Sequence, residues 1–538
     1  MNGRSFTRER VVFGALLVLL AAAFTAFSVW QSTRLGRLTS VPNYDDVIYF
    51  LSGTRLVEAF KEAGFDGVLQ QLRQHGLHAP FSTVVATTAF ATLGYHDWAP
   101  YAFNFIVVLV YLVGLNWLFR EWDWTERCLA LAFFLCLPFA TMAVVEFRPD
   151  LCWATLTGIG VTYGISAPDY FTRWRPAIFH ALLCAVALLA KPSTFAMTLI
   201  VFGYSACLRY AIELVARRTF FADAAIRRWL LEAGVVLVAT APFTIPFGKD
   251  TWVYFWRNSF GENKAIWTYA GDSVEHLRYY LTGYGAINNV GWLGFALLAI
   301  LLVAPIAAIV ARDWPGLARV LGIWVLVVVT WGINTWAAMK SPFLGGAFFA
   351  SLIFGSAMEM PRVCGVLFRN ARLRQVVLAI VALAGILLYR FPAYSGELNS
   401  KDGQNYLSAH EQAIPLLEKA QLRERPVIMF TQSGPLVPDN ITIWMLRKGI
   451  RPRIANQQFA RTPEDFESKL GRADLVFVQP AGMRGAFFNL PSEEFQARFR
   501  EKLDADPRYE LLGEVEGIDG KTVRIYERIR RKLRRENE

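Results

Sequence analysis

The chain of 538 residues carries little charge for its length. Charged residues make up 18% of the sequence and hydrophobic residues 54%, with a mean hydropathy of +0.32. A soluble domain does not need so much apolar surface, and long uncharged runs are typical of integral membrane proteins. The composition therefore predicts a membrane protein.

Cysteine pairs and nucleotide-binding loops are also missing. None of the six cysteines forms a CxxC pair, and none lies after residue 391. Both a disulfide framework and a zinc site are disfavoured, and small buried hydrophobic side chains are the better interpretation. No GxGxxG or GxxxxGK[ST] loop follows residue 391, so nucleotide binding has little support.

The net charge of +11 is explained by arginines that border apolar runs, and no nucleic-acid partner is expected.

Eleven apolar runs have roughly the length needed to cross a membrane. Arginines cluster in every second connection between them, so the positive-inside rule places these connections and the N-terminus in the cytoplasm. Residues 1–30 have the character of an uncleaved signal anchor. The predicted spans are 11–30, 99–119, 128–147, 151–167, 176–190, 193–208, 229–247, 287–311, 319–338, 342–359 and 375–391.

The apolar stretch 79–95 is not counted as a crossing, because a twelfth span would place the arginine clusters outside. Residues 46–95 are instead predicted to form helices along the outer interface. The exported side then receives 31–98, 148–150, 191–193, 248–286, 340–342 and 392–538.

The chain is predicted to have two domains, a transmembrane part over 1–391 and an exported α/β domain over 392–538. Runs at 427–431, 475–479, 509–514 and 522–526 are typical of strands, and 440–447, 463–470 and 492–503 of helices. The alternation predicts a small three-layer sandwich.

Ionisable residues gather on the face predicted to be exported. Asp45 and Asp46 follow the first span, and Tyr49 comes four residues after Asp45. Carboxylates at a helix start also oppose the helix dipole, and one acid can cap the helix while the other faces a site. A carboxylate pair can bind a divalent cation. The lysines on the same face favour independence from metal, and no cofactor is expected.

Further candidates lie at the later span ends. Arg148 and Asp150 flank Pro149, where the alternative is an internal salt bridge with a snorkelling arginine. Lys191 and Lys340 end their spans, and two cations outside favour an anionic partner over simple snorkelling. The remaining candidates are His78, near the outer headgroups, and Arg257 and His276, in the aromatic-rich stretch 248–286 that an interfacial belt also explains.

This inventory suits sugar transfer from a lipid-linked phosphate, which requires no nucleotide. A carboxylate can accept the proton of an attacking hydroxyl. Fixed lysine and arginine side chains can stabilise the leaving phosphate.

The sequence resembles the GT-C glycosyltransferases, especially the branch with protein O-mannosyltransferases and the lipid A aminoarabinose transferase. The resemblance covers roughly residues 8–350. It rests on Asp45-Asp46 with Tyr49, His78-Ala79-Pro80-Phe81, Arg148-Pro149-Asp150, Ala190-Lys191-Pro192, the aromatic run 252–257, and His276 to Tyr280. Ala79 replaces the usual first proline, and the C-terminal domain matches no subgroup, so the acceptor stays open.

The resemblance implies a GT-C-like fold and a reaction with inversion. It implies that Asp45 is the catalytic base with Asp46 in support, that Lys191 and Arg257 contact phosphate, and that Asp150 lines a substrate pocket. We therefore expect an inner-membrane enzyme that moves a sugar from a polyprenyl-phosphate donor to a lipid, glycan or protein acceptor. The rivals are a transporter of lipid-linked sugars, which would need charges along a path through the spans, and a non-catalytic assembly protein.

Overall fold

The computed structural model describes residues 3–42, 44–75, 79–217, 222–396, 401–420, 422, 424–431, 436–457, 460–479, 492, 495–517, 520 and 522–529. The chain forms two compact units. Unit 1 contains residues 1–31, 75–85 and 100–395, and unit 2 contains 32–74, 86–99 and 396–538. The division into domains 1–391 and 392–538 stays a prediction.

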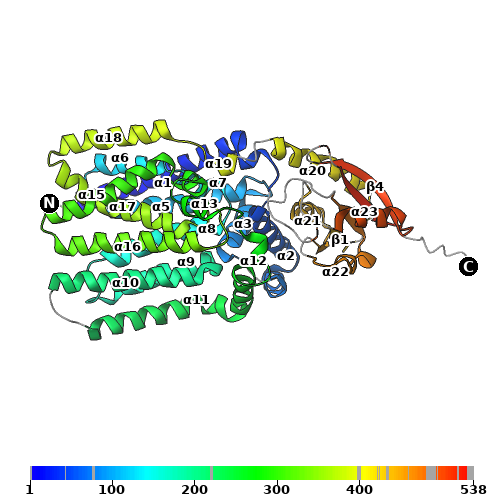
Figure 1. Ribbon diagram of the computed structural model, residues 1–538, viewed down its shortest axis with the longest axis horizontal. Coiled ribbons are helices and arrows are strands. Elements are labelled where there is room, and N and C mark those ends of the chain that lie inside the picture. The colour runs from blue at the N-terminus through cyan, green and yellow to red at the C-terminus, as the bar shows by residue number, and fades with distance from the viewer. Residues whose placement is uncertain are drawn as a thin grey trace, which may run out of the picture. The chain divides into compact units, whose positions relative to one another are not determined.

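Unit 1 is a helical bundle, and Figure 1 shows its long helices running side by side. A large cluster of buried aliphatic and aromatic side chains forms much of its core, and charged side chains such as Glu126 and Glu359 are buried in the same unit. The elements are α1 (Gly3–Leu35), α3 (Pro80–Leu93), α4 (Ala99–Phe103), α5 (Phe105–Leu118), α6 (Trp124–Leu135), α7 (Pro138–Val145), α8 (Pro149–Ser166), α9 (Trp174–Ala190), η2 (Pro192–Thr194), α10 (Phe195–Arg217), α11 (Ala222–Ser259), α12 (Lys264–Trp267), α13 (Ser273–Arg278), α14 (Tyr284–Asn289), η3 (Gly291–Leu293), α15 (Gly294–Val310), α16 (Trp314–Trp336), α17 (Gly346–Leu367), α18 (Ala371–Leu388) and α19 (Ala393–Gly396).

Seven helical stretches among the described residues are long and apolar enough to cross a membrane. An eighth is added if α6 and α7, which meet at a bend of 65°, count as one span. The chain is therefore a multi-pass membrane protein. The other three predicted spans form α8, α9 and α17, which are shorter or less apolar. Most of α8 and α17 is buried. Side chains that contact only other helices can be polar, which explains why these spans are less apolar than the others.

The predicted exported stretch 248–286 is helical at its start, which the sequence did not indicate. Helix α11 continues for 38 residues to Ser259 despite Pro242 and Pro246 in its interior. Arg257 therefore lies in the last turn of a long helix.

Unit 2 contains a five-stranded sheet in the order β2-β1-β3-β5-β4. Strand β1 (Val427–Phe430) is parallel to β2 (Arg453–Asn456) and to β3 (Leu475–Val478). Strand β5 (Thr522–Arg528) is antiparallel to β3 and to β4 (Tyr509–Glu516). Four strands are predicted from the sequence, and β2 is not.

Helices cover both faces of this sheet, so the predicted three layers are confirmed. Helices α20 (Lys401–Lys419) and α21 (Pro438–Arg447) pack on one face. Helix α23 (Gln496–Ala505) packs on the other, together with η5 (Leu470–Arg472), which follows α22 (Pro463–Glu467). Unit 2 also holds η1 (Arg37–Thr39), α2 (Tyr44–His75) and residues 86–93 of α3.

Candidate functional site

The acidic pair lies in the first turn of α2, where carboxylates favour helix initiation. The buried face of this helix begins with Val47, Phe50 and Leu51. Because Asp46 points to the same interior, its side chain is fully buried, whereas Asp45 is exposed. The two acids thus have different surroundings, and Asp45 is the one accessible to a substrate.

Arg37 is the partner of Asp46. The Arg37 Nε atom lies 3.5 Å from the Asp46 Oδ2 atom, and both side chains have no exposed surface. Sequence reasoning missed Arg37. The available signal was an arginine in a segment predicted to be exported, where cations are disfavoured. Tyr49, one helical turn after Asp45, is also buried, with 3% of its surface exposed.

Asp150 and Lys191 form an ion pair in unit 1. Asp150 lies in the first turn of α8 and Lys191 ends α9, so these two packed helices bring the charges together. The side chains are only 9% and 13% exposed. The Lys191 ammonium also lies 6.0 Å from the centroid of the Trp153 ring. The sequence suggested both residues but not that they pair.

Arg148 is held by partners other than Asp150. Its Nε atom lies 3.8 Å from the Glu146 Oε2 atom, and its Nη2 group donates to the Tyr394 hydroxyl at 3.1 Å. The guanidinium also lies 4.3 Å from the centroid of the Phe343 ring. Glu146 is 1% exposed and accepts a hydrogen bond from Ser395. Sequence reasoning missed Glu146.

Lys340 caps the C-terminus of α16. Its ammonium donates to the carbonyl oxygens of Asn334 and Thr335, each at 2.9 Å, and to that of Ala337. Burial lowers the pKa of Lys340 to about 8. The group therefore loses its charge at a pH only slightly above neutral.

Arg257 and His276 have partners within the stretch 248–286. Arg257 is exposed, and its Nε atom lies 3.6 Å from the Glu262 Oε1 atom. The His276 ring lies 5.4 Å from that of Tyr269, centroid to centroid. His78 lies outside the described residues.

The segment 340–346, which ends on the first residue of α17, contacts the candidates at the helix ends of unit 1. It begins with Lys340 and places Phe343 against Arg148. A Cβ atom added at Gly346 would lie 3.0 Å from the Trp153 ring, against which Lys191 also lies. The structure therefore brings Arg148, Asp150, Lys191 and Lys340 around one segment. Asp45, Asp46 and Tyr49 belong to unit 2.

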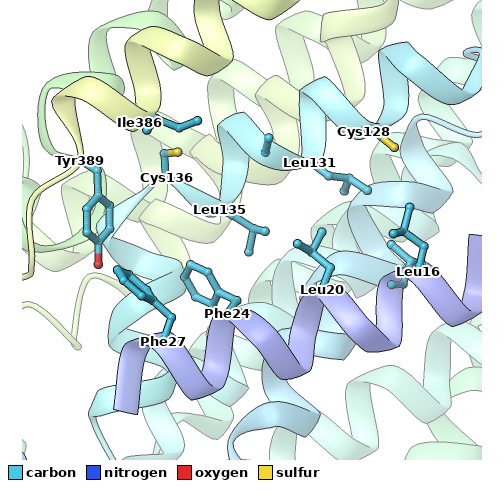
Figure 2. Close-up of a pocket in the computed structure, with 12 residues that line it drawn as sticks. Leu16, Leu20, Phe24, Phe27, Cys128, Leu131, Leu135, Cys136, Ile386 and Tyr389 are labelled. Carbon is cyan, nitrogen blue, oxygen red and sulfur yellow. The ribbon is translucent and has the colours of Figure 1, made fainter. Parts of the chain in front are cut away.

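An apolar cavity of about 470 Å³ lies among α1, α6 and α18 (Figure 2). Phe24, Phe27 and Leu135 project into it, and the Tyr389 hydroxyl lies at one end. No Asp, Glu, His, Lys or Arg side chain lines it.

Within the ranges given above, no group of three or more His, Cys, Asp and Glu side chains could hold a metal ion. Asp46 pairs with Arg37, and Asp150 pairs with Lys191.

Two solved structures are similar to this chain over nearly its full length. They are ArnT from Cupriavidus metallidurans in the apo state and the same protein bound to undecaprenyl phosphate. Each has a TM-score of 0.57 and covers 95% of this chain and 97% of its own, with identities of 12% and 13%. The chain has the GT-C fold.

No family model matches the sequence. No curated protein matches it either. The Archaeoglobus fulgidus oligosaccharyltransferase in complex with zinc and sulfate is similar at a TM-score of 0.41 and 16% identity, covering 86% of this chain and 68% of its own.

Proposed function

We propose that the protein transfers a sugar from a polyprenyl-phosphate donor to an acceptor hydroxyl at the outer face of the membrane. The observation that carries this proposal is the shared fold with ArnT, which has been crystallised bound to undecaprenyl phosphate. An exposed carboxylate at Asp45 and the lysine and arginine side chains at the helix ends of unit 1 support it.

Asp45 is the base in this scheme. The acceptor hydroxyl gives its proton to the Asp45 carboxylate, and the resulting oxygen attacks the anomeric carbon. The bond between that carbon and the phosphate oxygen breaks, so the sugar configuration inverts. Asp46 supports this step by fixing the first turn of α2 through Arg37.

Cations stabilise the leaving phosphate. Lys191 is the first candidate, because its ammonium is fixed between Asp150 and the Trp153 ring. Arg148 and Lys340 lie near the same segment and add positive charge, while Arg257 and His276 supply outer contacts. Charges fixed before the reaction stabilise a developing anion more than mobile ones, because no reorganisation is needed.

The topology belongs to the same proposal. The N-terminus lies in the cytoplasm of a plasma-membrane protein, and the C-terminal domain is exported. Asp45 then faces the compartment where lipid, glycan or protein acceptors are found. His78 and Tyr49 are proposed to help bind the substrate.

The test is a transfer assay with the purified protein in nanodiscs. Synthetic polyprenyl-phosphate sugars are supplied one at a time with candidate lipid, glycan and peptide acceptors, and released polyprenyl phosphate is measured. We expect release with one donor class, unchanged by EDTA. Movement of intact donor across proteoliposomes without cleavage would instead support the transporter. Absence of both activities, with Asp45→Ala functional in cells, would support the assembly protein.

A further inference from the structure

Helix α21 contacts α2 within unit 2. The Asn440 side-chain amide donates a hydrogen bond to the backbone carbonyl of Pro42, two residues before α2 begins. The Asp439 carboxylate also interacts electrostatically with the Arg55 guanidinium on α2. The N-terminal turn of α21 therefore hydrogen-bonds to the residues that lead into α2 and interacts with a charged group on that helix.

The C-terminal end of α21 reaches α2 through α3 and the residues after it. Arg447 Nη2 lies 3.8 Å from Asp97 Oδ1, and its guanidinium lies 5.0 Å from the centroid of the Tyr95 ring. The Tyr95 hydroxyl donates to Glu58 on α2. Phe90, which also lies beneath Arg447, packs edge-on against Phe50 of α2 at 5.5 Å.

A third contact lies just beyond α21. Arg451 forms an ion pair with Glu62, immediately before the break in α2 at Ala63 and Gly64. Interactions from 439–451 thus reach from Pro42, just before α2, to Glu62, at the end of its straight part. One turn after Phe50, a Cβ added to Gly53 would lie only 2.7 Å from the Ala86 Cβ atom, so the backbones of α2 and α3 approach closely there.

Arg55 and Asp439, which take part in these interactions, are shielded from solvent. Burial lowers the pKa of Arg55, and the Asp439 carboxylate opposes that change. Burial likewise raises the pKa of Asp439, and Arg55 opposes it. Removing one member of a partly buried pair leaves the other uncompensated, so such pairs define one arrangement of the elements that carry them.

We propose that α21 holds the straight part of α2 in place and thereby positions the Asp45 carboxylate for the reaction. Asn440, Asp439 and Arg447 are positioning residues, because each acts through α2 and not on substrate. This gives the C-terminal domain a role in catalysis without a group of its own in the active site. The catalytic part of this inference rests on the proposed function, and the structural part does not.

The test uses the full-length protein in nanodiscs and the double variant Asn440→Ala/Arg447→Ala. Amide hydrogen exchange is measured for peptides that cover 44–58, with peptides of β1 and β3 as internal references. We expect exchange in 44–58 to rise about tenfold, as for the loss of one or two hydrogen-bonded contacts, while β1 and β3 stay protected. Lys448→Ala is the matched control, because it removes the exposed pair with Glu418 at the end of the same helix, and it should change neither readout.

The kinetic readout separates positioning from general stability. In the double variant kcat should fall about 10- to 100-fold while the KM for donor stays within about twofold, as expected for a misplaced catalytic group. Restoring charge with Asn440→Ala/Arg447→Lys should recover part of kcat. If β1 and β3 also lose protection, the single variant Asn440→Asp is measured instead, and it must show faster exchange in 44–58.

Unchanged exchange in 44–58 would overturn the inference. If exchange rises but the wild-type protein transfers no sugar from any donor, then α21 still holds α2 in place and the proposed function fails. If exchange rises and kcat does not fall, α21 holds α2 but does not position Asp45, and the inference is likewise overturned.

Discussion

Arg37 and Asp46 form an ion pair with no exposed surface on either side chain, 3.5 Å from Nε to Oδ2. Taking two charges out of water is costly, and each is tolerated only while the other is present. The pair therefore fixes the turn that precedes α2 to the first turn of that helix.

Removing the cation alone should be severely destabilising. Arg37→Ala leaves the Asp46 carboxylate buried, and we expect a loss of about 3–5 kcal/mol in the free energy of unfolding. Thermal unfolding of the detergent-solubilised protein, followed by circular dichroism, measures it. The double variant Arg37→Met/Asp46→Leu should recover most of the loss. A single variant as stable as the wild type would contradict the buried pairing.

Lys191 should affect activity more than Asp150 does. Lys191→Met removes a cation proposed to stabilise the leaving phosphate, and kcat/KM should fall about 10²-fold or more. Asp150→Asn keeps the cation but loosens it, so a smaller fall is expected. Steady-state kinetics with the donor varied measures both. Equal losses in the two variants would mean that the pair acts only as a structural unit.

Lys340 should give the reaction an alkaline limit. Its pKa of about 8 means that the ammonium is charged below that pH and neutral above it. If its charge helps to bind the anionic donor, the KM for donor should rise as the pH increases through 8. Lys340→Arg stays charged throughout and should lose this rise. A pH profile identical in both proteins would restrict Lys340 to capping α16.

The predicted orientation can be tested with reporters. A reporter fused after residue 538 should be active only as an exported protein, and one placed before residue 1 only as a cytoplasmic one. A cytoplasmic C-terminus would place Asp45 on the wrong side for an exported acceptor.

Much of the fold could be predicted from the sequence, because apolar runs define membrane helices and alternating runs define strands. Strand β2 was missed because Arg453–Asn456 is short and half polar. The bend between α6 and α7 was missed because the run 128–145 is almost entirely apolar, although Pro138 marks the break. Amino-acid composition indicates which segments are buried, but it does not indicate in which direction the chain continues after a bend.

The candidate site was less predictable than the fold. Residue type and position identified Asp45, Asp150 and Lys191 as candidates. Their partners depend on tertiary packing: Asp150 meets Lys191 because α8 packs on α9, and Arg148 meets Glu146 in place of Asp150. The contacts between α21 and α2 join residues about 400 positions apart and have no local signal.

The most direct test of the account compares wild type with Asp45→Asn in the transfer assay, using the donor that the wild type cleaves. The variant keeps the size of the side chain and should insert and fold normally, yet release of polyprenyl phosphate should fall about 10²–10⁴-fold, as for the loss of a general base. Release at the wild-type rate from Asp45→Asn would contradict the central claim that this carboxylate accepts the acceptor's proton.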